Sequence, residues 1–287
     1  MTIRIASDGR KKIIADGYQV LKQSELVGTS PTVFIFPEEI ELTAGPASFH
    51  RQFLDLYISQ YSKSYLDDLI AYRKIVLQRN KLLKEILVVK DGEKQLEAWN
   101  NLLVEHGARI VGARKNFVES IEKAVSDYYN GFDSESKLDL YYRPKINTDE
   151  DDLRKSIIKL LESYKSRETR AGLTLVGPHR DRLEINLRSK SIRHFGSRGQ
   201  KRCAMIAMKL AAADYLSRIK EEPATLILDE VFAELDADKS QALIKILSNY
   251  NQVFMATAGE YKFNNNKVAK FYINNGKIGG IKNDNSN

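Results

Sequence analysis

Two acidic residues, Asp229 and Glu230, follow the apolar run 224–228, and their types and position could do phosphate chemistry. The run predicts a strand buried on both faces, as in a parallel sheet covered by helices. Open α/β sheets bind ligands at the carboxyl ends of such strands. Asp229 could hold Mg²⁺ there through water, and Glu230 could polarise the water that attacks a γ-phosphate. A strand that ends in a solvated acidic turn is the simpler alternative, and the run alone favours it.

A second segment, Ser197-Arg198-Gly199-Gln200, could also contact a phosphate. Apolar residues from Gln200 to about Lys220 recur at helical spacing, so we expect a helix there with one apolar face. Ser197 is a candidate N-cap, Gly199 would let the backbone approach a ligand, and a helix N-terminus attracts anions. An ordinary capped helix explains this turn in isolation. The turn and the two acids together, one helix apart, favour the functional interpretation.

This order resembles the way in which ATP-binding-cassette ATPases divide a nucleotide site between two subunits. The resemblance implies that Ala233-Glu234-Leu235-Asp236 couples the subunits, and it makes Asp236 and Thr257 candidate nucleotide contacts. Thr257 follows the predicted strand 252–256, where many cassette ATPases have a histidine that senses the γ-phosphate. A hydroxyl can donate a hydrogen bond there but carries no charge. The sequence contains no Gly-x-x-x-x-Gly-Lys-[Ser/Thr], so the phosphate-cradling half of the site is absent from it.

Further segments make the resemblance specific to the RecF family, bacterial DNA replication and repair proteins of the SMC/Rad50-like branch of these ATPases. The segments are Phe34-x-Phe36-Pro37-Glu38-Glu39-Ile40, Gly45-Pro46, Arg51-x-Phe53-Leu54-Asp55, Leu77-Gln78-Arg79-Asn80-x-Leu82-Leu83-Lys84, Gly177-Pro178-His179-Arg180-Asp181 and Phe195-Gly196-Ser197-x-Gly199-Gln200-x-Arg202. Arg182 and Arg198 stand where the family usually has Asp and Gln. Family members begin with a strand, a P-loop and a helix that do not precede Met1. The sequence therefore resembles a member entered partway through its first domain.

The resemblance implies a DNA-binding protein that dimerises with ATP and Mg²⁺. In that family two subunits close head to tail, so the segment Ser197–Gln200 of one would complete the site beside Asp229 and Glu230 of the other. Such dimers bind gapped DNA or junctions of single-stranded and double-stranded DNA. They act with RecO and RecR to place RecA on single strands, and they serve the SOS response. The family hydrolyses ATP weakly, but without a P-loop this chain is not expected to do so unaided.

The charge of the chain agrees with a DNA partner. Its 45 Lys and Arg residues against 38 Asp and Glu give a net charge of +7. The predicted helix around Tyr72 to Leu87 has a basic face, which a solvated surface and a DNA contact explain equally well. The candidate DNA-binding residues are Arg73, Lys74, Arg79, Lys81, Lys84 and, in the turn after Gly177-Pro178, Arg180.

The order of the predicted elements indicates an α/β fold, a partial cassette-type (P-loop NTPase-like) ATPase domain with an inserted, mainly helical lever domain. We assign residues 1–44 and 166–287 to the ATPase domain and residues 45–165 to the lever. We expect helices at 47–59, 64–89 and 95–129, the last open to a break near Gly107. The other expected elements are a hairpin with its turn at Ser7-Asp8-Gly9, strands at 138–143, 173–176 and 183–187, helices from the acidic run 149–152 to about 167 and from 238 to about 249, and a disordered end at 283–287.

Composition excludes several classes of protein. The single cysteine, Cys203, excludes a disulfide framework, no apolar run approaches a membrane span, and the four histidines lack metal-ligand spacing. We therefore expect a cytoplasmic bacterial protein. Two alternatives stay open, namely a non-catalytic DNA-binding fragment or pseudo-ATPase, and another cassette ATPase such as a transporter subunit. The helical segment 48–152 and Thr257 argue against the transporter.

Overall fold

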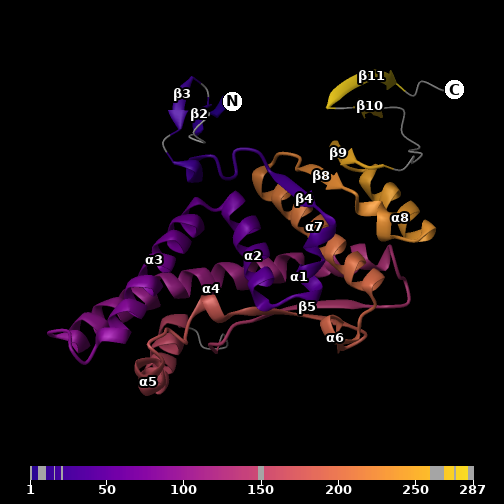
Figure 1. Ribbon diagram of the computed structural model, residues 1–287. Helices are drawn as coiled ribbons and strands as arrows, with labels where there is room; N and C mark the ends of the chain where they lie inside the picture. The colour runs from indigo at the N-terminus through magenta and orange to yellow at the C-terminus, as the bar shows by residue number, and fades with distance from the viewer. Residues whose placement is uncertain are drawn as a thin grey trace.

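The computed structural model describes residues 2–5, 11–15, 17–20, 22–147, 152–258, 268–274 and 276–283. The predicted turn at Ser7-Asp8-Gly9, the acidic residues 149–151 and the tail after residue 283 lie outside the described residues. The described elements form a parallel sheet, a helical layer and an antiparallel sheet, with a pair of long helices reaching outward (Figure 1).

A three-stranded parallel sheet contains the acidic pair. Its strands are β4 (Thr32–Ile35), β8 (Thr225–Asp229) and β9 (Gln252–Ala256), in the order β4-β8-β9. Both pairings are parallel, and Asp229 lies beside Ala256 in the register. The two strands predicted near these positions are confirmed to within one residue. Because parallel strands end at the same edge, the residues after β8 and β9 come together there.

Helix α7 (Arg198–Lys220) covers one face of this sheet and is buried on all sides over much of its length. Every residue from 202 to 213 is buried, although the apolar spacing predicted only one buried face. The reason is that β4 packs on one side of α7, and α2 (Ala47–Tyr61) and α4 (Gly92–Asn130) pack on the other. The helix is thereby packed within a layer from residue 202 onward, while its first turn, residues 198–201, stays nearer the surface.

The predicted lever is an α-helical hairpin with a third helix beside it. Helices α3 (Lys63–Glu85) and α4 pack along each other, and α5 (Leu153–Ala171) packs against both. Figure 1 shows α3 and the first part of α4 extending away from the parallel sheet. Helix α4 runs through Gly107 without the predicted break, and that glycine lies buried near Tyr72, Ile157 and Pro178.

The second half of α4 lies between α7 and an antiparallel sheet. That sheet contains β5 (Leu138–Arg143), β6 (Arg182–Leu187) and β7 (Lys190–Ser191), and the first two strands were predicted. The strand predicted at 173–176 is wrong. The backbone N–H groups that would pair with a neighbouring strand bind side chains instead. Asn80 accepts from the Thr174 N–H and Glu168 accepts from the Leu175 N–H, both at 2.6 Å.

The remaining elements are short or peripheral. They are β1 (Thr2–Ile5), β2 (Lys11–Ala15) and β3 (Tyr18–Val20) in one antiparallel sheet, the hairpin β10 (Ala269–Asn274) and β11 (Lys277–Asn283), helices α1 (Glu41–Ala44), α6 (Ile192–Phe195) and α8 (Ala237–Leu247), and the 3₁₀ turns η1 (Gln23–Glu25), η2 (Pro37–Ile40), η3 (Pro178–Arg180) and η4 (Val231–Glu234). Among the helices of the described residues, none combines the length and apolar composition that crossing a bilayer requires.

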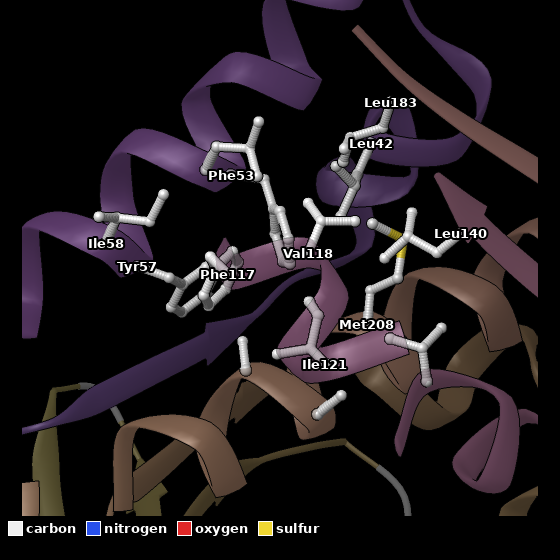
Figure 2. Packing of buried hydrophobic residues seen from close by; sticks show 14 of the residues in the cluster. Leu42, Phe53, Tyr57, Ile58, Phe117, Val118, Ile121, Leu140, Leu183 and Met208 are labelled. Atoms are coloured by element: carbon white, nitrogen blue, oxygen red, sulfur yellow. The ribbon is translucent and has the colours of Figure 1, made fainter. Parts of the chain in front are cut away.

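One apolar cluster joins the helical layer to both sheets (Figure 2). Phe53 and Tyr57 of α2 meet Phe117 of α4, with ring centroids 4.9 Å apart between Phe53 and Tyr57 and 6.0 Å between Phe53 and Phe117. Met208 of α7 and Leu140 of β5 belong to the same cluster. The helical layer therefore connects the parallel sheet to the base of the helical hairpin.

Two histidines, His50, which is buried, and His179, which is half-buried, make the fold sensitive to acid. Burial lowers the pKa of His50 and of His179 from 6.5 to about 4. Between about pH 4 and 6.5 the unfolded chain binds more protons at these histidines than the folded chain does. Their contribution to the free energy of unfolding is therefore fully present above about pH 6.5 and is lost as the pH drops toward 4. Urea unfolding across this range is expected to show the loss, and His50→Asn together with His179→Gln is expected to reduce its slope. An unchanged slope would contradict neutral burial of these rings.

Candidate nucleotide-binding site

The acidic pair lies at the carboxyl edge of the parallel sheet. The Asp229 side chain is exposed, and within the described residues it forms no hydrogen bond or ion pair. Glu230 has a left-handed backbone (φ 46°, ψ 29°), which is uncommon for a residue other than glycine. Its N–H donates to the carbonyl of Ala256 at 3.0 Å, and its Oε1 accepts from the N–H of Ala258 at 2.9 Å. These bonds fix the Glu230 carboxylate beside the end of β9.

This edge could hold a hydrated cation. Asp229 offers an unpaired carboxylate to solvent, and Glu230 keeps one oxygen, Oε2, outside its bond to Ala258. Thr257 lies between the two residues that hold Glu230, so three predicted site residues meet at one edge. Hard Mg²⁺ prefers such carboxylate and hydroxyl oxygens, usually with several retained waters. Their role in holding Mg²⁺ or a nucleotide remains a prediction.

The turn before α7 has the predicted cap. The Ser197 Oγ accepts from the Gln200 N–H at 3.2 Å, while the Gln200 Oε1 accepts from the Ser197 N–H at 2.9 Å. This reciprocal capping box leaves the Ser197 hydroxyl proton free to donate outward. A Cβ placed on Gly199 would meet nothing within 4 Å, so packing within the chain does not require glycine there. The turn therefore presents donors and open space to a ligand.

A shared carboxylate joins this turn to the loop after the acidic pair. Glu234 of η4 accepts from the Arg198 Nη2 at 2.7 Å and Nε at 3.1 Å, and it pairs with the Arg202 Nη2 at 3.1 Å. Arg198 is mostly exposed, whereas Arg202 is only 2% exposed. Within the described residues, the Arg202 Nε and Nη1 atoms have no hydrogen-bond partner. Glu234 therefore provides the main compensating charge for the buried guanidinium of Arg202.

Asp236, a candidate nucleotide contact, also has a structural role. It caps α8 by accepting from the Lys239 N–H at 2.9 Å, and its other oxygen pairs with the Lys239 ammonium. These bonds lower the pKa of Asp236. Lys239 also lines a polar cavity of about 430 Å³ together with Ser197 and Gln200. A nucleotide role for Asp236 remains a prediction.

The turn and the acids are separate within one chain. The hydrogen bonds of Ser197 and Gln200 stay within the cap, and those of Glu230 run to β9. Arg198 reaches the acidic loop only through Glu234 in the part of the chain that the structure describes. Within the described residues, the turn and the acidic pair thus share no direct hydrogen bond.

Most of the candidate DNA-binding residues are exposed. Lys74, Lys81 and Lys84 lie exposed along α3, and Arg73 is exposed while its Nη2 donates to Asp55 at 3.0 Å. Arg180 is the last residue of the η3 turn, and its Nη2 donates to the carbonyl of Thr174 at 3.0 Å. These positions keep positive charge available on the lever and at its base.

Arg79 does not belong to this exposed set. Its side chain is 2% exposed and forms an ion pair with Glu168, which is 1% exposed. It also donates to Thr174 at 2.9 Å and to Asn100 at 2.8 Å. Arg79 therefore holds α3, α4, α5 and the following segment together, and the prediction that it contacts DNA is corrected on this ground.

The comparison with protein families points to the same segment of the chain. Residues 169–249 match the family described as "SbcC/RAD50-like, Walker B motif". This range contains the Ser197 turn, helix α7, the acidic pair and Glu234.

Curated proteins and a solved structure resemble nearly the whole chain. A DNA replication and repair protein RecF from Chloroherpeton thalassium is 35% identical over 248 residues, covering 84% of this chain and 67% of the relative. RecF from Ligilactobacillus salivarius is 32% identical over 283 residues, covering 93% and 73%. A structure of the recombination mediator protein RecF with ATP in the RecFOR pathway superimposes with a TM-score of 0.84 at 30% identity, covering 95% of this chain and 73% of that one. The chain spans about two thirds to three quarters of these proteins' own lengths.

Proposed function

Because the chain belongs to the RecF family of DNA replication and repair proteins, we propose that it binds DNA as a dimer that closes around ATP and Mg²⁺. The observation that supports this most is the pair of open half-sites: the exposed cap at Ser197 and the unpaired carboxylate of Asp229. In this proposal each half-site faces its counterpart on a second copy. Membership in this family excludes the transporter alternative.

The residues present fit part of a nucleotide site. Asp229 would hold Mg²⁺ through water, and the ion would neutralise charge on the phosphate oxygens. Glu230 would orient a water from its fixed position, and Thr257 would donate a hydrogen bond at the same edge. Ser197, Arg198, Gly199 and Gln200 would meet the phosphates of the other copy through the hydroxyl and the helix N-terminus. The phosphate-cradling loop is not among the 287 residues, so this chain supplies a partial site.

The place of action follows from a relative that works in the RecFOR pathway. We propose that this chain acts in the bacterial cytoplasm at gapped DNA or at junctions of single and double strands. It would there act with RecO and RecR to help load RecA. Residues 1–44 and 166–287 would form the ATPase domain and residues 45–165 the lever. The exposed cations of α3 and Arg180 would contact the DNA backbone.

Removing lysines from α3 tests the DNA surface. Exchanging Lys74, Lys81 and Lys84 for Ala is expected to weaken binding to gapped DNA and to reduce the slope of log affinity against log salt by about 2 to 3. Fluorescence anisotropy between 50 and 200 mM salt, roughly the range in which such contacts are lost, measures both. Exchanging Lys123, Lys137 and Lys245 for Ala removes the same charge elsewhere. Equal effects from the two triple variants would contradict a direct contact between the α3 lysines and DNA.

The same titrations distinguish the second candidate, a non-catalytic DNA-binding protein. In that candidate the exposed lysines of α3 and Arg180 bind DNA without a nucleotide. Tight DNA binding that ATP and Mg²⁺ leave unchanged would support it. Binding that ATP strengthens would support the gated dimer, and absence of DNA binding would contradict both.

A further inference from the structure

A cavity of about 270 Å³ lies where α2, α3 and α4 meet the η3 turn. Three arginines line it, each from a different helix: Arg51 from α2, Arg73 from α3 and Arg114 from α4. The cavity lies apart from the nucleotide half-sites, since none of their residues lines it. Its position at the base of the lever places it beside Arg180, one of the proposed DNA contacts.

Two of the three arginines are already paired. Arg114 is buried and donates to Asp55 at 2.7 Å, to the carbonyl of Pro178 at 2.7 Å and to the Tyr65 hydroxyl at 3.0 Å. Arg73 donates to the second oxygen of Asp55. Asp55 is therefore neutralised from both sides and offers little repulsion to an incoming anion.

The second carboxylate, Asp181, lies beneath the cavity and is also committed. It is 1% exposed, pairs with Arg114 at 3.4 Å and accepts from the Tyr142 hydroxyl. Burial raises the pKa of Asp181, while Arg114 and the Tyr142 hydroxyl favour its charged form. The acids around the cavity thus compensate Arg114 and Arg73, with little charge left for another cation.

Arg51 is the cation without a matching acid. Within the described residues its one hydrogen bond goes from Nη1 to the backbone carbonyl of Asp181, at 2.9 Å. A guanidinium has five N–H donors, so most of those on Arg51 have no protein acceptor. Burial and the neighbouring Arg114 lower the pKa of Arg51, and the nearby carboxylates of Asp181 and Asp55 offset only part of this shift. An anion in the cavity would accept hydrogen bonds from the unused N–H donors of Arg51 and would balance its positive charge.

We propose that this cavity binds a phosphate group of a DNA strand, with Arg51 as its main contact. Arg51 keeps several N–H donors for the oxygens of a phosphate, and Arg73 and Arg114 add positive charge to the lining from two other helices. Ser48 and Gln52 add neutral polar groups, and Leu69 and Val76 give an apolar wall for a sugar or base. The inference rests on the proposed DNA-binding function and adds a defined phosphate site to it.

The test compares Arg51→Met with the unaltered chain. Anisotropy titrations use a gapped DNA with either a 5′-phosphate or a 5′-hydroxyl at the gap. Loss of a charged hydrogen bond is expected to weaken binding roughly tenfold. A loss confined to the 5′-phosphorylated DNA identifies a strand end as the source, and a loss on both DNAs identifies an internal phosphate. Either result supports the site, and unchanged affinity for both overturns it.

A second measurement is independent of DNA. Inorganic phosphate is expected to raise the melting temperature of the unaltered chain above its value in chloride of equal ionic strength, and not to do so for Arg51→Met. Arg218→Met, which removes an exposed arginine elsewhere, is expected to keep the phosphate effect. An equal rise in all three proteins would overturn the site. If the unaltered chain bound no DNA, the proposed function would fail, while this measurement would still decide whether the cavity binds phosphate.

Discussion

Ser197→Arg is expected to abolish ATP-dependent dimerisation while the chain stays folded. Ser197 is exposed at the start of α7, and open space lies before Gly199. A long side chain would fill the space through which the phosphates of the other copy must approach. Loss of the cap costs about 1 kcal/mol, which is small beside a typical free energy of unfolding of about 5–15 kcal/mol. Sedimentation velocity with ATP, Mg²⁺ and gapped DNA measures the change.

Two further variants separate the cap from the ligand contact. Ser197→Asp keeps a good cap but places negative charge against the phosphates, so it is also expected to remain monomeric. Ser197→Thr keeps both the cap and the hydroxyl and is expected to dimerise. Normal dimerisation of the Arg variant would contradict the role of this turn.

Glu168→Ala is expected to lower the free energy of unfolding by about 3–5 kcal/mol. Glu168 and Arg79 are both almost fully buried, and the truncation leaves the Arg79 guanidinium without its compensating charge. Glu168 also accepts from the Leu175 N–H, so the segment before η3 loses an anchor. Urea unfolding of the variant and the unaltered chain gives the difference directly.

Replacing the whole pair provides the matched control. Arg79→Met combined with Glu168→Leu removes both charges and is expected to recover much of the loss. Asp67→Ala breaks the exposed pair of Asp67 with Lys63 and is expected to cost at most about 1 kcal/mol. If Glu168→Ala cost no more than Asp67→Ala, the buried network would have no structural role.

Local sequence signals predicted the elements around the candidate site well. The Ser197 cap depends on residues three apart, and β8 and β9 show as short apolar runs between turn signals. Their parallel pairing brings Asp229 and Thr257 to one edge without any further information. The strand at 173–176 was wrong because Asn80 and Glu168, residues from other elements, take its backbone groups.

The partners of the buried charges could not be predicted in the same way. Arg79 falls on the buried face of α3, at helical spacing from Tyr72, Ile75 and Leu82, but its partner Glu168 lies 89 positions away in the sequence. Arg202 is likewise buried against Glu234, and nothing in its neighbours distinguishes it from an exposed arginine. The shortage of acids around Arg51 arises only when α2, α4 and η3 meet. Such contacts depend on the tertiary fold, which a spacing pattern does not contain.

Cross-linking between copies tests the head-to-tail site most directly. Phe195→Cys lies beside the Ser197 turn and Ala258→Cys lies beside Glu230, and both positions are exposed. The native Cys203 is buried and burial raises its pKa to about 12, so it adds little background reaction. When the two single variants are mixed with a short bis-maleimide, the account predicts a cross-linked heterodimer that requires ATP and Mg²⁺. No cross-link, or equal cross-linking without ATP, would contradict it.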